Sequence, residues 1–206
     1  MFNWLKKLFK KMEPLNINIC VDPGHGLSNS KPGVYDSGAV AGKLQLTEAD
    51  IVLKWGLELE KQLRESGFNA IVTRDKKLTP CSLSSRVQKA KAFKSDLLIS
   101  LHCNAANGKA TGTETFFRFQ RSKRIAERVN TNLVAVLGLK NRGIKNEAES
   151  ARGKIFVLSY EQSILIELGF IDNPSDYSVI TNEEKITKGC ESIVKSLLSL
   201  YDTKSP

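Results

Sequence analysis

The chain has 206 residues, of which 41% are hydrophobic, so it is long enough to bury a sizeable core in one globular domain. Its 31 Lys and Arg residues against 22 Asp and Glu give a net charge of +9, which favours anionic partners such as nucleic acid, acidic lipid or other charged polymers. No run approaches the ~20 apolar residues that span a bilayer, and no two of the four cysteines form a Cys-x-x-Cys metal or redox pair.

Residues 1–13 form a separate segment. At about 100° per residue, its apolar and aromatic side chains fall on one arc and four lysines on the other, which predicts a basic amphipathic helix. Such a helix is typical of a segment that lies on an anionic membrane or polymer, and a helix docked on its own domain is the alternative. Pro14 ends it, and a single domain over residues 14–206 follows. The segment lacks the features of a secretory signal, so we expect a chain that is cytoplasmic until released.

The rest of the chain alternates between predicted strands and predicted helices. A charged, glycine-containing loop is expected at 141–154, and no internal repeat is found. This alternation predicts an α/β fold, a three-layer α/β/α domain with a mainly parallel, twisted sheet flanked by helices. The predicted strands are 17–21, 68–73, 96–101, 113–119, 155–158 and 163–168, and the predicted helices begin at 48, 82, 121 and 182.

The first predicted strand ends in Asp22-Pro23-Gly24-His25-Gly26. Proline fixes one backbone angle and glycine permits conformations closed to other residues, so the chain turns sharply and presents His25. In open α/β sheets, the carboxyl ends of the strands are where ligands bind. The sequence therefore predicts a site at this edge.

Three more ionisable side chains fall where predicted elements begin or end. His102 and Glu167 stand at the carboxyl ends of two strands, and Glu48 stands in the first turn of a helix. If the strands are parallel neighbours, all four residues converge at one edge. Two imidazoles and one carboxylate are a ligand set for catalytic zinc, and a further acid can take a proton from water.

Each of these residues also has a purely structural interpretation. Glu48 could favour the dipole of its helix, Glu167 could form a buried salt bridge, and His102 could be a hydrogen-bonded core residue. Cys103 is a poor additional ligand, because neighbouring residues of a strand point to opposite faces.

Seven motifs together resemble the zinc-dependent N-acetylmuramoyl-L-alanine amidases of the type 3 class, which cut bacterial peptidoglycan. The resemblance covers residues 17–200, and the motifs occur in the order of that family. They are Val21-Asp22-Pro23-Gly24-His25-Gly26, Asp36-x-Gly38-Ala39, Glu48, Ser100-Leu101-His102-Cys103-Asn104-Ala105, Gly112-Thr113-Glu114-Thr115, Asn141-Arg142-Gly143 and Glu167-Leu168-Gly169-Phe170-Ile171-Asp172-Asn173.

The resemblance implies a zinc ion (Zn2+) on His25, Glu48 and His102, with Glu167 as the catalytic acid/base. The implied reaction is hydrolysis of the amide between N-acetylmuramic acid and L-alanine of the stem peptide, as in autolysins and endolysins. Glu114 also matches, and it either orients a ligand histidine or pairs with a nearby arginine. The expected partner is peptidoglycan, with contact to an anionic membrane or wall polymer through residues 1–13, and the expected state is a monomer.

Two other functions fit the same sequence. A zinc peptidase would keep the metal site and cut within the stem peptide, and a catalytically dead basic module would bind wall polymers or nucleic acid. Nucleic acid is not expected as a partner, because the domain has no stripe of basic residues interleaved with aromatics. The arginines and lysines of 118–128 are interpreted as a solvated helix face.

Overall fold

A computed structural model of the chain describes residues 14–40, 46–150 and 153–201. The helix predicted for residues 1–13 lies outside the described residues, so it and the domain boundary after it stay predictions.

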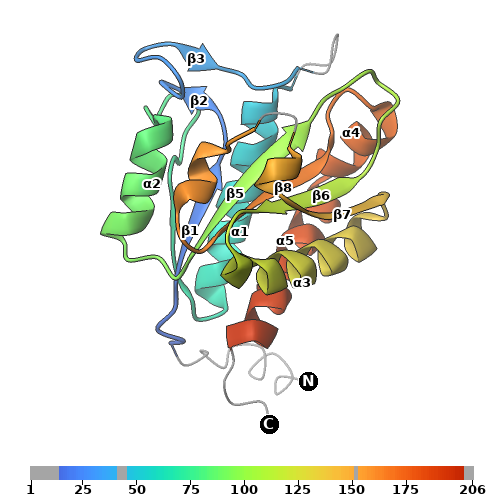
Figure 1. Cartoon of the computed structure of the whole chain (residues 1–206). Helices are drawn as coiled ribbons and strands as arrows, with labels where there is room; N and C mark the ends of the chain where they lie inside the picture. Colours follow the sequence, from blue (N-terminus) through green and yellow to red (C-terminus); the bar gives the residue numbers. More distant parts are fainter. Residues whose placement is uncertain (1–13, 41–45, 151–152, 202–206) are drawn as a thin grey trace, which may run out of the picture.

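Six strands of the described chain form one sheet, and four of its five pairings are parallel (Figure 1). The exception is the pairing of the fifth strand in the sheet with the fourth, which is antiparallel. In sheet order the strands are β4 (Asn69–Val72), β1 (Asn18–Pro23), β5 (Leu97–Asn104), β8 (Ser163–Phe170), β6 (Thr113–Phe117) and β7 (Asn141–Asn146).

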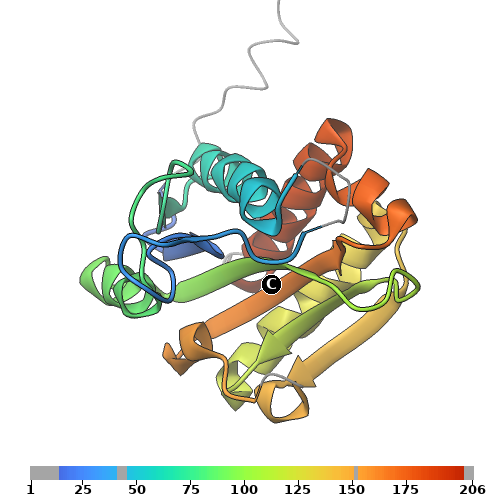
Figure 2. The same ribbon diagram turned by 90° about the horizontal axis from the view of Figure 1, so that it is seen from above.

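Helices cover both faces of the sheet (Figure 2). One face, called here the rear face, packs against α1 (Glu48–Glu65) and α3 (Gln120–Leu137), and α5 (Glu183–Tyr201) packs on these two helices. The other, called here the pocket face, packs against α2 (Leu83–Ala92) and the 3₁₀ turn η3 (Phe156–Ser159). A short helix, α4 (Pro174–Ile180), follows β8. The predicted three-layer α/β/α architecture is confirmed.

The larger apolar core lies on the rear face, where side chains from the sheet meet the apolar stripes of α1, α3 and α5. A smaller core on the pocket face joins α2 and η3 to the sheet. The first turn of α1 is fixed by a capping box, in which Thr47 and Asp50 bind each other's backbone amides. The four cysteines are buried free thiols.

Two predicted elements differ from the structure. The expected loop at 141–154 contains the edge strand β7, followed by the 3₁₀ turn η2 (Glu147–Glu149). The expected strand at 155–158 is instead the 3₁₀ turn η3. β7 carries only one apolar side chain, so its strand conformation comes from backbone pairing with β6 and not from an apolar pattern.

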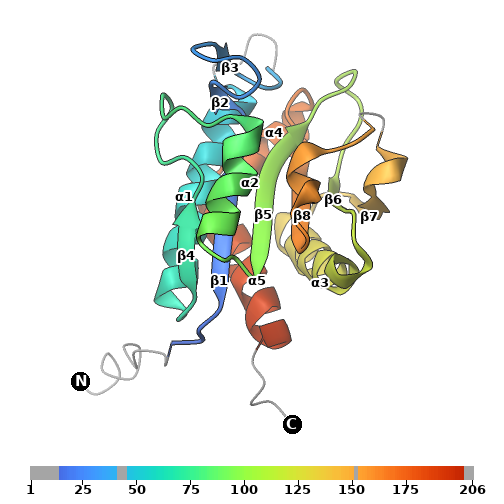
Figure 3. The ribbon, with the colours of Figure 1, turned by 60° about the vertical axis from the view of Figure 1, so that its left-hand side comes forward.

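The long segment after β1 contains a small hairpin of β2 (Gly26–Leu27) and β3 (Tyr35–Asp36), visible above the sheet in Figure 3. None of the described helices is both long and apolar enough to cross a bilayer.

Candidate metal centre and pocket

Two buried arginines donate hydrogen bonds to the backbone carbonyls of the turn after β1. Arg74 donates from Nε to the carbonyl of Pro23 (2.9 Å) and from Nη2 to that of Gly24 (2.8 Å). Arg86 donates to the carbonyls of Pro23 (2.9 Å) and His25 (2.6 Å). His25 has φ of 59°, a conformation that costs a non-glycine residue free energy and therefore needs such support.

Asp22 is the counter-charge for this arginine pair. Its carboxylate lies 2.6 Å from Arg86 and accepts hydrogen bonds from Thr73 (2.5 Å) and Ser100 (2.7 Å), with every partner buried. Burial alone would raise the pKa of Asp22, but the guanidinium of Arg86 and the two hydroxyl groups outweigh it and lower the pKa. The base of the turn is therefore a buried, ionised network that fixes the position of His25.

His25, Glu48 and His102 form one cluster, with ligand atoms that all lie within 4.8 Å of one another. Oε1 of Glu48 lies 3.0 Å from Nε2 of His25 and 3.0 Å from Nδ1 of His102. The Glu48 carboxylate also accepts from the backbone amides of Cys103 (2.9 Å) and Ala39 (2.8 Å). The start of α1 thus supplies a buried carboxylate, held by two backbone donors, to the two imidazoles.

Asp36 orients the first histidine. Its Oδ2 lies 3.0 Å from Nδ1 of His25 and accepts from Asn29 (2.6 Å), while its Oδ1 accepts from the amide of Gly38 (2.9 Å). A proton on Nδ1 that faces a carboxylate leaves Nε2 as the free lone pair, the arrangement found behind metal-binding histidines. Burial lowers the pKa of His25, but Glu48 and Asp36 reverse this and raise it. Carboxylates that favour an imidazolium also favour a metal cation at the same point.

Two glycines leave room for the cluster. A Cβ on Gly24 would lie 2.4 Å from Cε1 and 2.5 Å from Nε2 of His102. A Cβ on Gly38 would lie 2.5 Å from Oε2 of Glu48 and 2.7 Å from Cδ2 of His25. Gly24 is therefore required for space and not for an unusual backbone angle, which differs from the reason expected from the sequence.

The cluster fits a divalent cation. Nε2 of His25 is buried and has no hydrogen-bond partner among the described residues, although Oε1 of Glu48 is 3.0 Å away. Burial lowers the pKa of His102 more than Glu48 raises it, so this imidazole is neutral, as a ligand must be. An unpaired buried nitrogen, a neutral imidazole and a buried carboxylate are what a metal site offers.

Glu167 lies beside the cluster, within β8. It pairs in register with His102 of β5, so both side chains project from the pocket face. The sequence placed each of these residues at the end of its strand, whereas both strands continue beyond them. Only 3% of Glu167 is exposed. The structure thus brings His25, Glu48 and His102 into one cluster, with Glu167 in the neighbouring register position.

Glu114 occupies the next register position, opposite Glu167 on β6. Among the described residues it pairs with Arg142 (2.7 Å), Lys145 (2.6 Å) and Asn104 (2.8 Å), and neither histidine is a partner. Of the two roles predicted for Glu114, pairing with an arginine is the one that its contacts support.

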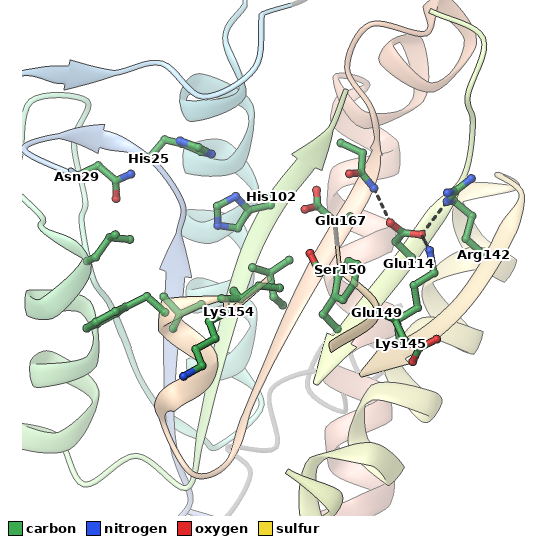
Figure 4. A pocket seen from close by; sticks show the side chains of 17 residues that line it. His25, Asn29, His102, Glu114, Arg142, Lys145, Glu149, Ser150, Lys154 and Glu167 are labelled. Atoms are coloured by element: carbon green, nitrogen blue, oxygen red, sulfur yellow. Dashed lines mark hydrogen bonds and ion pairs between the residues drawn. The ribbon is translucent and has the colours of Figure 1, made fainter. Parts of the chain in front are cut away.

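A pocket of about 440 Å³ joins these residues (Figure 4). His25 and His102 stand at one end, and Glu114 with its two basic partners stands at the other, beyond Glu167. Leu83 of α2 and Phe156 of η3 form part of an apolar wall, and both are partly exposed. The pocket can hold a chain molecule that carries both apolar and charged groups.

Reasoning from the sequence missed the roles of Arg74, Arg86 and Asp36. A signal was present for the first two: Asp22 is a charge at the end of an apolar strand, and a buried charge needs a partner. Which of the 31 basic residues would supply it depends on the packing of α2 against β1, which the sequence does not display.

Comparison with known proteins identifies the family. Residues 19–199 match the Amidase_3 family model, described as N-acetylmuramoyl-L-alanine amidase. The chain belongs to this amidase family. Its class of activity is that of a cell-wall amidase, a hydrolase that acts on peptidoglycan.

Three relatives of this amidase chain illustrate the match. YqiI of Bacillus subtilis, an uncharacterised protein, is 36% identical over 89% of the chain and 84% of its own length. The N-acetylmuramoyl-L-alanine amidase LytC of Bacillus subtilis is 33% identical over 89% of the chain, which spans only 35% of LytC. The crystal structure of an N-acetylmuramoyl-L-alanine amidase from Clostridium difficile 630 is similar with a TM-score of 0.78, at 29% identity, over 92% of this chain and 99% of that one.

Proposed function

We propose that this chain hydrolyses the amide between the lactyl group of N-acetylmuramic acid and L-alanine of the stem peptide, with zinc held by His25, Glu48 and His102. The observation that carries the proposal is the cluster of two imidazoles and one buried carboxylate in a chain of the amidase family. Two histidines and a glutamate are a known ligand set of catalytic zinc.

The residues around the cluster would hold the ligands in position before the metal binds. The amides of Ala39 and Cys103 fix the Glu48 carboxylate, and Asp36 holds a proton of His25 at Nδ1, so that Nε2 is the nitrogen available to a metal. When bound, zinc would lower the pKa of a coordinated water to about 7 and polarise the scissile carbonyl. Pre-positioned ligands matter because their own hydrogen bonds set both metal affinity and ligand orientation.

Glu167 is the proposed acid/base residue. Its carboxylate removes a proton from the attacking water and then delivers a proton to the leaving amine of L-alanine. Its burial and its register with His102, on a strand about 5 Å away, support this role, because an acid/base group must lie within reach of the reacting atoms.

The test is digestion of purified peptidoglycan, with mass analysis of the fragments. We expect glycan with free lactyl carboxyl groups and peptides with an amino-terminal L-alanine. Chelator should abolish the reaction and added zinc restore it. Glu167→Gln should slow it at least ~100-fold with bound metal retained. Glu149→Gln, which removes an exposed carboxylate from the same pocket, is the matched control and should keep its activity.

Two outcomes would contradict the proposal. Cuts within the stem peptide, with the sugar linkage intact, would indicate a peptidase. Binding to peptidoglycan without any cleavage, in the presence of zinc, would indicate a dead binding module.

A further inference from the structure

The end of the pocket farthest from the histidines carries two cations on one buried carboxylate. Oε2 of Glu114 accepts from Nε of Arg142 at 2.7 Å and from Nζ of Lys145 at 2.6 Å, while its Oε1 accepts from Asn104. The side chain of Glu114 is 6% exposed, whereas those of Arg142 and Lys145 are 29% and 28% exposed. The anion is therefore buried, and both cations reach the pocket (Figure 4).

The group formed by Glu114, Arg142 and Lys145 carries a net charge of about +1. Burial alone would raise the pKa of Glu114, but Lys145, Arg142 and Asn104 outweigh it and lower the pKa, so Glu114 is ionised at neutral pH. One carboxylate faces two cations, and the bond from Arg142 uses only Nε. The two terminal amino groups of the guanidinium are therefore not used by Glu114, and a guanidinium binds carboxylates with a fork of donors.

An aromatic ring also fixes the orientation of Arg142. The guanidinium carbon of Arg142 lies 5.0 Å from the centre of the Phe170 ring, within the range of a cation–π contact. Because Phe170 and Glu114 already hold the guanidinium of Arg142 in place, this side chain loses little conformational freedom when it binds an anion. This lowers the entropy cost of binding.

The distance to the metal cluster follows from the sheet register. Glu167 pairs with His102 on one side and with Glu114 on the other, so Glu114 lies two strand spacings, about 10 Å, from His102. An extended peptide advances about 3.3–3.6 Å per residue. If the scissile amide lies at the histidines, the second residue of the stem peptide lies about 7 Å beyond it, and a carboxyl group on that residue reaches the two cations.

We propose that Arg142 and Lys145, positioned by Glu114, form a subsite for the free carboxylate of the second stem-peptide residue. The inference rests on the proposed amidase reaction and adds the substrate class: stem peptides with a charged second residue, not an amidated one. An amide at that position has no charge, and its NH2 group would be a donor facing two donors. Sites built for one polar group reject the mismatched analogue, because the buried partners are left unpaired.

Lys154 and Glu149 also carry charges in the pocket, and Glu167 stands in the register position next to Glu114. Lys154 lies on the side of η3, across the pocket from Arg142 (Figure 4), and Glu149 is exposed and accepts from the backbone amide of Asn146. Lys154 therefore provides a matched control, since Lys154→Gln removes one positive charge from the same pocket without touching the Glu114 group.

The experiment uses two soluble substrates, N-acetylmuramyl tripeptides with L-alanine, D-glutamate or D-isoglutamine, and L-lysine, which differ only in that one carboxyl group. We expect the unmodified chain to prefer the glutamate form about tenfold in kcat/KM, mainly through KM. Arg142→Gln and Lys145→Gln should each lose most of this preference, and circular dichroism spectra that match that of the unmodified chain show that they fold. Lys154→Gln should keep the preference.

Equal cleavage of both substrates by the unmodified chain, or a preference that persists in Arg142→Gln and Lys145→Gln, would overturn the subsite. Cleavage of neither substrate would refute the proposed reaction instead. In that case the Kd of each tripeptide for Glu167→Gln, measured by calorimetry, decides the subsite without turnover: tighter binding of the glutamate form supports it, and equal binding overturns it.

Discussion

The two faces of the sheet are packed differently. The core described on the rear face consists of apolar side chains such as Val129 and Leu133 and contains no buried ion pair. The pocket face has a smaller apolar cluster and buries the ion pair of Asp22 and Arg86. Apolar packing is non-directional and stabilises the fold through the area that it removes from water. A buried ion pair contributes less net stability, because both charges lose their hydration, but it fixes positions. The rear face therefore supplies most of the stability, and the pocket face supplies geometry.

The largest expected effect comes from breaking the buried pair. Asp22→Asn leaves Arg86 without a counter-charge and should lower the free energy of unfolding at neutral pH by about 3–5 kcal/mol. Urea denaturation measures the change. Asp75→Asn, the same replacement at an exposed site, is the control and should leave the midpoint unchanged.

The same pair predicts a pH dependence. The pKa of Asp22 is lower in the folded chain than its unfolded value of about 3.9, so the unfolded chain binds more protons below that pH. The contribution of Asp22 is therefore complete at neutral pH and is lost as the pH falls through its folded pKa. The difference in free energy of unfolding between the unmodified chain and Asp22→Asn should therefore decrease below about pH 4. A gap that stays constant on acidification would contradict this.

The matching change on the rear face is Leu133→Ala. Leu133 is fully buried on α3, and its truncation leaves a cavity, so the free energy of unfolding should fall by about 2–5 kcal/mol. Because no charge is involved, this loss should be the same at pH 4 and pH 7, and kcat should be unchanged where the variant is folded. A loss of activity in the folded variant would show that the two faces are not independent.

Next in size is the effect of displacing one ligand. In Gly24→Ala the new Cβ would lie 2.4 Å from the ring of His102, so the ring must move, and shifts of about 1 Å in such sites cost ~100-fold in rate. Peptidoglycan hydrolysis and bound zinc should both fall, with little loss of stability. Gly33→Ala is the control for backbone strain without a clash, because its Cβ meets nothing within 4 Å although its φ is +73°; it should lose some stability and keep its activity. Full activity of Gly24→Ala would contradict the placement of His102 over the turn.

A smaller effect is expected from Asp36→Asn, which removes the carboxylate that faces Nδ1 of His25. Loss of such a partner lowers metal affinity about 10- to 100-fold. Competition with a chromophoric chelator measures the affinity for zinc. An unchanged affinity would mean that Asp36 only closes the hairpin of β2 and β3.

Deletion of residues 1–11 should change neither the stability supplied by the rear face nor the activity of the pocket face. It removes four lysines, so binding to vesicles of anionic lipid should weaken and lose its salt dependence, while kcat on soluble substrates stays the same. Unchanged binding to both vesicles and cell walls would refute the role predicted for this segment.

The sequence by itself determined the α/β architecture and the identity of the clustered residues. The longer apolar runs of β1, β5 and β8 were predicted correctly as strands, because a strand buried on both faces consists of nearly continuous apolar residues. The convergence of His25, Glu48 and His102 was also predictable, since a strand end and a helix start meet at one edge of such a sheet.

The tertiary structure alone decided what the sequence left ambiguous. β7 is a strand because it pairs with the edge of β6, and β6 runs antiparallel to β8. The segment predicted as a strand at 155–158 is instead the turn η3, which packs against α2 and β8. The partners of Asp22 and Glu114 are basic residues 28 or more positions away. The local sequence pattern indicates whether a residue belongs to a strand or a helix. The charged partner of a buried residue depends on how separate elements pack together, and a local pattern does not contain that information.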